Sequence, residues 1–230
     1  MSRRFSSWRD GLLVTTALFS SCALPLTPAC PPLCEPSGQT TERAYGAKSV
    51  YGTVVDAATG EPIEGVNVLA EWHLWGGAEN GKIVGYPKVL ETTTDVNGHF
   101  EFPAWQAHGS YAGGPGPGAP AVWFFKPDYQ ITVFSNNLEA VNPLDMTPRW
   151  NGRLLKMARA SSDAAVRQSS MLGLSVAIRD IHEHSGLSAL PRFVCAVARE
   201  NERQKMANHG VPLPPPAYLK SWGVDCAASP

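Results

Sequence analysis

The sequence predicts a mainly β protein, an antiparallel β-sandwich with a C-terminal α-helical extension. Between residues 49 and 135, apolar and polar side chains alternate with the period of two that a half-buried strand requires. Turn signals made of Gly, Pro, Asn and Asp separate these stretches. Beyond residue 161, apolar residues recur at spacings of three and four, which indicates helices with one apolar face.

The clearest strand follows a turn at residues 57–62. Its apolar row consists of Val66, Val68, Ala70, Trp72 and Leu74. The other row carries Asn67, Glu71 and His73, so we expect the first row in the core and the second towards water. Asn97-Gly98 predicts a second hairpin, because these residues adopt positive φ at low cost. Phe100 and Phe102 then continue the buried face.

Several short motifs in this region resemble the carboxypeptidase regulatory-like family. They are GTVVD at 52–56, TGEPI at 59–63, GVNV at 65–68 and TDVNGHF at 94–100. The FKPDY run at 125–129 is similar to the family's Pro-Gly-Tyr corner, with Asp128 in place of Gly. The resemblance covers roughly residues 49–134. It implies a prealbumin-like sandwich, as in transthyretin, and a module that is mostly non-catalytic in this family.

The rest of this region is predicted to alternate between long loops and short strands. Residues 76–87 and 106–120 are rich in Gly and polar residues, which indicates two loops. Long loops on a rigid sandwich commonly bind ligands, although they also tolerate insertions that have no role. Residues 121–125 and 130–134 are predicted to be strands, and 136–153 to be irregular.

Two helices are expected in the last part of the chain, within an extension that spans 136–230 together with the irregular linker. The stripe of the first helix is Met171, Leu174, Ile178 and Ile181. Ser161 or Ser162 can cap its start and Gly186 can end it. A second helix is expected from near Ser188 to Gly210, with Pro191 in its first turn.

The N-terminus predicts export and a lipid anchor. Arg3, Arg4 and Arg9 precede a short apolar stretch at 11–19, which is too short to span a bilayer. Ser20-Ser21-Cys22 follows and resembles the lipobox of bacterial lipoproteins, which implies a signal peptide at 1–21 and lipidation of Cys22. Ala23 then implies sorting to the outer membrane, facing the periplasm. The alternative is an ordinary secretory signal that leaves a soluble secreted or periplasmic protein.

A Pro-rich tether is expected at 22–48, between the anchor and the sandwich. Four cysteines remain after lipidation, and an oxidising compartment favours their pairing. We expect a Cys195–Cys226 disulfide, because it would pin a Pro-rich tail to the second helix; the alternative is a buried, free Cys195. Cys30 and Cys34 can pair locally or stay free.

Composition and motif spacing favour neither nucleic acid nor a metal. The formal net charge is −1 and no long basic run occurs, so nucleic acid is not an expected partner. His182-Glu183-His184 lacks the spacing that puts two imidazoles on one helix face, and we interpret it as a polar helix end. Asp95-Val96-Asn97-Gly98 is interpreted as a turn rather than a calcium loop. We therefore predict no catalytic residue, metal or cofactor.

The expected function is that of a non-catalytic binding or structural module held at the envelope by a lipid. Its partner would be a protein, a peptide or a glycan. The candidate binding surface is Trp75, Trp105, His108 and Tyr111, although core packing is the commoner fate of such aromatics. The alternative is an envelope hydrolase or metalloenzyme with a site in the loops around His73, His99 and His108.

Overall fold

The computed structural model describes residues 43–76, 82–109, 119–134, 147–204 and 213–228. The strands are β1 (Arg43–Ala47), β2 (Val50–Asp56), β3 (Asn67–Gly76), β4 (Lys82–Thr93), β5 (His99–Phe102), β6 (Trp105–Gly109), β7 (Ala121–Phe125), β8 (Thr132–Phe134) and β9 (Leu154–Met157). The helices are α1 (Ala164–Ser185), α2 (Pro191–Arg203) and the 3-10 helix η3 (Pro216–Trp222).

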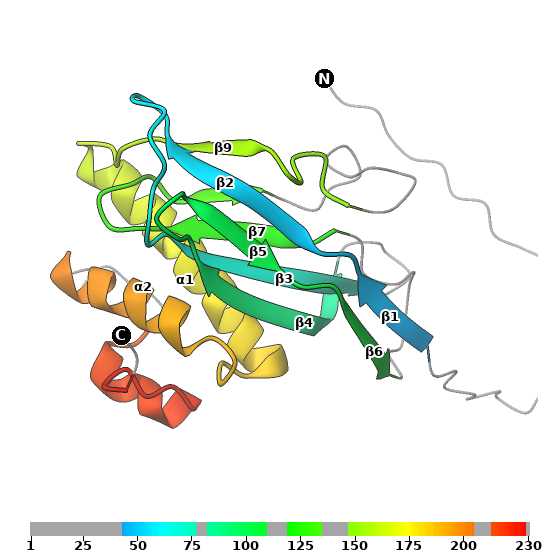
Figure 1. Ribbon diagram of the computed structural model, residues 1–230. Coiled ribbons are helices and arrows are strands. Elements are labelled where there is room, and N and C mark those ends of the chain that lie inside the picture. Colours follow the sequence, from blue (N-terminus) through cyan, green and yellow to red (C-terminus); the bar gives the residue numbers. More distant parts are fainter. Residues whose placement is uncertain (1–42, 77–81, 110–118, 135–146, 205–212, 229–230) are drawn as a thin grey trace, which may run out of the picture. The chain divides into compact units, whose positions relative to one another are not determined.

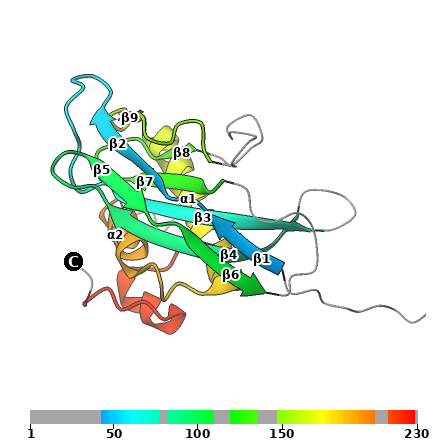
Figure 2. The same cartoon turned by 45° about the vertical axis from the view of Figure 1, so that its right-hand side comes forward.

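The predicted fold class is confirmed, because the described chain forms an open β-sandwich with C-terminal helices (Figure 1). One sheet has the order β5-β2-β9 and the other β4-β3-β7-β8, while β1 and β6 form a separate pair. Neighbouring strands are antiparallel except β2 and β9, which are parallel. The helices pack on the outer face of the four-stranded sheet and make a third layer (Figure 2).

The predicted core row at residues 66–74, most of it on β3, is confirmed. Val66, Val68, Ala70, Trp72 and Leu74 are at most 3% exposed and share one core cluster with Phe100, Phe102 and Phe124. The turn at residues 95–98 is also present, but it does not close a hairpin, because β5 pairs with β2 whereas β4 pairs with β3 in the other sheet. Gly98 has a φ of 70°, and a Cβ there would lie 2.3 Å from the Val54 carbonyl oxygen, so only glycine fits.

The expectation that the other face of β3 meets water is wrong. Leu69, Glu71 and His73 are 0%, 4% and 8% exposed. Leu69 belongs to a second core cluster that includes Leu174 and Ile178 of α1. The helical layer therefore covers this face, and the polar residues on it are buried.

Both helices lie close to where they were expected. The predicted stripe of α1 is confirmed, since Met171, Leu174, Ile178 and Ile181 are at most 3% exposed. Its N-cap is Asp163 rather than Ser161 or Ser162, because the carboxylate accepts a hydrogen bond from Ala165 N at 2.8 Å. Gly186 is the C-cap. Helix α2 begins at Pro191 and ends at Arg203, earlier than the end expected at Gly210, which lies outside the described residues.

Four strands differ from the sequence expectations. β9 pairs with β2 although it follows residue 135, so the sandwich extends into the region expected to be linker and helices. β1 lies in the region expected to be tether, and it pairs with β6, which occupies the start of the loop expected at 106–120. β4 likewise begins at Lys82, inside the loop expected at 76–87.

The disulfide expected between Cys195 and Cys226 is present, with Cα atoms 5.4 Å apart. It joins α2 to the segment after η3, and both cysteines belong to the core cluster under the helices. Cys22, Cys30 and Cys34 lie outside the described residues. Within the described ranges, no helix is long and apolar enough to cross a membrane.

Candidate functional site

Of the four side chains predicted to form an aromatic binding surface, the structure describes that of Trp105. Trp105 is 8% exposed, and its ring packs edge-on against Trp72 with centroids 5.4 Å apart. Trp105 is therefore a core residue, and the prediction that it belongs to a binding surface is wrong. Trp75 lies on β3 and His108 on β6, but their side chains and Tyr111 lie outside the described residues.

The histidines of the alternative enzyme site are also separated. His99 lies on β5 and is exposed, with its ring 6.4 Å from that of Tyr51. His73 lies on the outer face of the other sheet, under the helices, with its ring 5.2 Å from that of Tyr86. The two layers of the sandwich stand between them. Within the described ranges, no three His, Cys, Asp or Glu side chains form a group able to hold a metal ion.

A buried polar cluster joins β3, β4 and β7 to α1. Glu71 Oε1 accepts a hydrogen bond from Trp123 Nε1 at 3.0 Å and lies 3.1 Å from His73 Nε2. Tyr86 donates its hydroxyl hydrogen to Asp180 of α1. Burial, followed by this bond, raises the pKa of Tyr86, so the phenol stays protonated and remains a donor. The cluster therefore fastens the helix to the sheet.

The His182-Glu183-His184 run is the polar C-terminal end of α1, and its side chains also contact neighbouring parts of the chain. The His182 ring stacks on Trp222 of η3 with centroids 4.3 Å apart. His184 Nδ1 lies 2.8 Å from the Asp180 carbonyl oxygen, one turn back on α1. Both histidines lie in the last turn, where a positive charge is favourable.

Asp56 fixes the corner between β7 and β8. Its side chain accepts hydrogen bonds from the N–H groups of Ala58 and Thr59, from Tyr129 Oη at 3.0 Å and from Arg159 Nε at 2.9 Å. The Arg159 guanidinium also lies over the Tyr129 ring, 4.2 Å from its centroid. The bond from Ala58 N is the main cause of the lowered pKa of Asp56, so the carboxylate stays charged.

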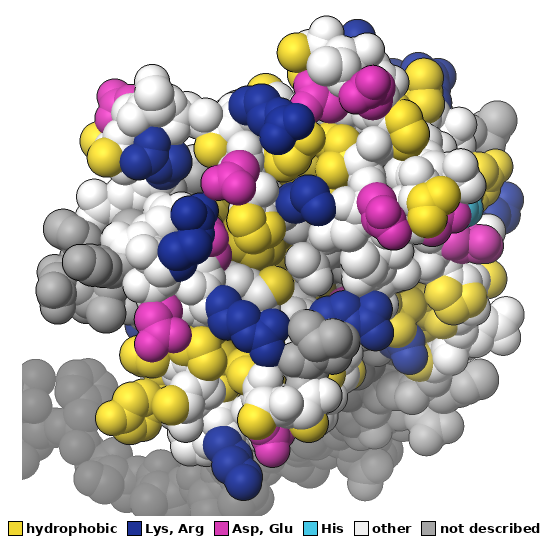
Figure 3. All heavy atoms as spheres, turned by 60° about the vertical axis from the view of Figure 1, so that its left-hand side comes forward, with side chains coloured by type: hydrophobic (Ala, Val, Ile, Leu, Met, Phe, Trp, Pro, Cys, Tyr) yellow, Lys and Arg dark blue, Asp and Glu magenta, His cyan; other side chains and the backbone are white. Residues whose placement is uncertain are grey.

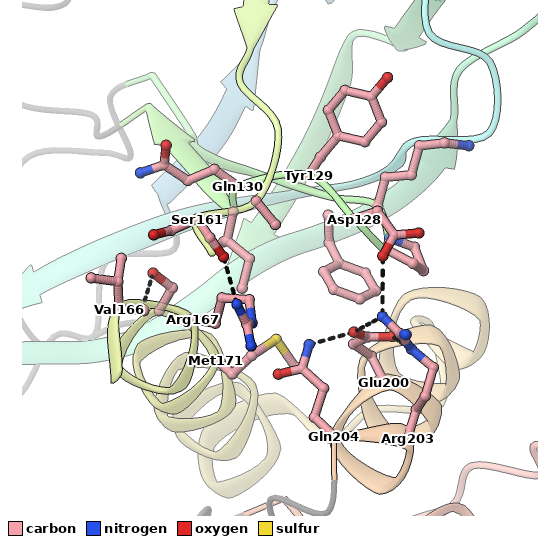
Figure 4. A pocket seen from close by; sticks show the side chains of 16 residues that line it. Asp128, Tyr129, Gln130, Ser161, Val166, Arg167, Met171, Glu200, Arg203 and Gln204 are labelled. Atoms are coloured by element: carbon pink, nitrogen blue, oxygen red, sulfur yellow. Dashed lines mark hydrogen bonds and ion pairs between the residues drawn. The ribbon is translucent and has the colours of Figure 1, made fainter. Parts of the chain in front are cut away.

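A pocket of about 360 Å³ lies next to this corner (Figure 4). Three parts of the chain line it: the β7–β8 corner at 125–131, the start of α1 with the residues before it, and the last turn of α2. Figure 4 shows Met171 and Gln204 directed into the space between the two helices and the corner. Its size is within the range of small-molecule sites.

Charged side chains of both signs line the pocket. Arg203 Nη2 lies 2.7 Å from Glu200 Oε1 and 3.3 Å from Asp128 Oδ1. Glu200 is 4% exposed and also accepts a hydrogen bond from Gln204, and its bonds to Arg203 raise the pKa of that guanidinium. Arg167 Nη1 donates instead to two backbone carbonyls, those of Ser161 at 2.6 Å and Ser162 at 2.8 Å.

Asp128 is the residue that takes the place of Gly in the corner motif. Its φ is 66°, the left-handed conformation that Gly adopts most readily, and it is the one non-glycine residue with positive φ in the described ranges. The bond from Ala160 N to its carbonyl oxygen, at 2.9 Å, holds this conformation. The corner thus holds Asp128 in a conformation that glycine adopts readily, and it presents a carboxylate to Arg203.

Sequence reasoning did not find this pocket. Its lining comes from three segments that are far apart in the chain, and no local pattern joins them. The Asp at position 128 was the available signal, because it predicts a carboxylate at a corner where the resembling motif has Gly.

Comparisons with known proteins add little. No family model matches this chain, and no curated protein matches it. Among solved structures it is similar to 3-chlorocatechol 1,2-dioxygenase from Rhodococcus opacus 1CP, with 14% identity, a TM-score of 0.29, and coverage of 52% of this chain and 62% of that one. It is also similar to a 9R-lipoxygenase from Cyanothece PCC8801, with 12% identity, a TM-score of 0.28, and coverage of 76% of this chain and 26% of that one. Such low TM-scores carry no argument about fold or activity.

Proposed function

We propose that this protein is a lipid-anchored, non-catalytic binding module of the bacterial envelope, and that the pocket beside the β7–β8 corner is its binding site. The observation that supports a binding role is the pocket itself. It combines ion-paired and hydrogen-bonding groups with apolar side chains in a space of about 360 Å³. Polar groups that converge on a cavity beside apolar side chains are the feature that orients a ligand in such sites.

The anchor in this proposal rests on the sequence. The charged start, the apolar stretch and Ser20-Ser21-Cys22 resemble a lipoprotein signal, and the Pro-rich residues that follow suit a tether. The non-catalytic role rests on the resemblance of residues 49–134 to the carboxypeptidase regulatory-like family. A partner of this module would be a protein, a peptide or a glycan of the envelope.

Filling the pocket tests the binding site. Ser170 lines it, whereas its neighbour Ser169 is exposed on α1 outside the lining. A small-molecule and peptide library is screened by ligand-observed NMR against the mature full-length protein and the variants Ser170→Trp and Ser169→Trp. We expect ligands that bind the wild type and Ser169→Trp to be lost in Ser170→Trp, with both variants folded by circular dichroism. If no compound binds, or Ser170→Trp keeps every ligand, the proposed site is wrong.

A further inference from the structure

The balance of charge in the pocket points to one kind of ligand. Arg203 is offset by the two carboxylates within its reach, Glu200 and Asp128. Arg167 differs, because its partners in the described ranges are the neutral carbonyls of Ser161 and Ser162. The pocket therefore contains one guanidinium whose charge no described carboxylate neutralises.

The geometry of Arg167 leaves part of its donor set available. Both of its bonds use Nη1, so Nε and Nη2 have no acceptor within the described ranges. The two bonds also hold the side chain in place, which lowers the entropy that a ligand would have to remove on binding. A guanidinium with a free pair of donors matches a carboxylate, which accepts two parallel hydrogen bonds.

Apolar side chains lie beside this guanidinium. Val166 and Met171 flank Arg167 on α1, and Ile131 and Phe125 line the pocket from the sheet side. Figure 3 views the side of the molecule that lies at the left of Figure 1, where the start of α1 and the end of α2 meet the sheet. Lys and Arg side chains are spread over that face together with Asp and Glu side chains, and hydrophobic side chains are exposed between them.

We infer that the pocket binds a carboxylate carried on a small apolar body, with Arg167 as the residue that recognises the carboxylate. This inference rests on the proposed function. Two kinds of molecule carry a carboxylate on a small apolar body: a peptide whose last residue is apolar, through its C-terminus, and a free aliphatic acid. Hydrogen bonds to charged groups are strong enough that losing the guanidinium should weaken binding roughly ten- to a hundredfold.

Paired acids and amides test the inference. Isothermal titration calorimetry on the mature full-length protein measures the affinity for the peptide Ala-Ala-Leu with a free or an amidated C-terminus, and for hexanoate beside hexanamide. The variants are Arg167→Gln and Arg167→Lys. The matched control is Arg179→Gln, since Arg179 lies on the same helix, outside the pocket lining, and pairs with Glu183. Circular dichroism and the thermal midpoint show whether each variant is folded.

We expect at least one acid to bind about tenfold or more tightly than its amide, in wild type and in Arg179→Gln. Arg167→Gln should abolish this preference, and Arg167→Lys should keep part of it because the charge remains. A preference in the peptide pair alone, or in the hexanoate pair alone, supports the inference and identifies the source.

Amides that bind as well as acids, but lose binding in Ser170→Trp, would overturn the carboxylate assignment and leave the binding site standing. If no compound binds, both proposals fail, and a folded Arg167→Gln that keeps the preference overturns the role of Arg167.

Discussion

Replacing Trp72 with Ala should be among the most destabilising changes in the sandwich. The side chain is fully buried between the two sheets, and its ring packs edge-on against Trp105. Emptying such a site costs about 3–5 kcal/mol in the free energy of unfolding. The loss of the edge-to-face pair places this variant towards the upper end of the range.

The neighbouring variant His73→Ala tests the third layer of the fold. On a sandwich with a solvated outer face, His73 would be exposed and its loss would cost little. Here it is 8% exposed, and its Nε2 lies 3.1 Å from the buried Glu71 Oε1. Removing a partner from a buried polar group costs about 1–3 kcal/mol, so His73→Ala should be clearly destabilising although less so than Trp72→Ala.

Urea denaturation of the oxidised, mature full-length protein, followed by circular dichroism, measures both values. The control is Val133→Ala on β8, because Val133 is 45% exposed and such a change should stay within about 0.5 kcal/mol. If His73→Ala costs no more than the control, the helices do not cover this sheet in solution. If His73→Ala costs more than Trp72→Ala, the register of β3 is shifted by one residue, because a one-residue shift exchanges the two faces.

Three further outcomes are expected. Replacing Cys195 and Cys226 with Ser should lower the free energy of unfolding by about 3–4 kcal/mol, since the bond closes a loop with a sequence separation of 31; a Cys195 peptide that is alkylated without prior reduction would argue against the bridge. The pKa of Asp56 is lowered, chiefly by Ala58 N, so its contribution is complete above the unfolded pKa of about 3.9 and is lost as the pH falls through the folded value. The stability difference between wild type and Asp56→Asn in urea titrations should therefore shrink below about pH 4, and an equal difference at both ends of the range would contradict this. Radiolabelled palmitate should label wild type but not Cys22→Ser, and equal labelling of both, or of neither, would reject the anchor.

The parts of the fold that sequence predicted are those encoded by neighbouring residues. The alternation around Trp72 identified a buried row, because side chains on a strand point to the same face at every second residue and one of these faces packs in the core. Asn97-Gly98 identified a turn, since the steric demand of positive φ acts on single residues. The α1 stripe was equally local. In each case a few adjacent side chains carry the whole physical reason for the structure.

The parts that sequence missed depend on partners far away in the chain. β9 is four residues long and pairs with β2 in parallel, so neither a hairpin turn nor a long alternation marks it. Glu71 and His73 were expected to face water, since polar residues usually do, but the helices are added more than eighty residues later and cover this face. The pocket is missed for the same reason, since its lining meets only after the helices have docked on the sheet.

Asp128 has an unusual backbone conformation in the β7–β8 corner and also contributes a carboxylate to the pocket. A left-handed conformation at a non-glycine residue costs about 1–3 kcal/mol, and Gly at this position would avoid that cost. Asp128 instead places a carboxylate 3.3 Å from Arg203, which already pairs with the buried Glu200. Exposed ion pairs contribute little to stability, so this contact alone does not offset the strain. Under the proposed function the carboxylate has a role in the pocket, because it helps to neutralise Arg203 and leaves Arg167 as the guanidinium that would meet an anionic ligand.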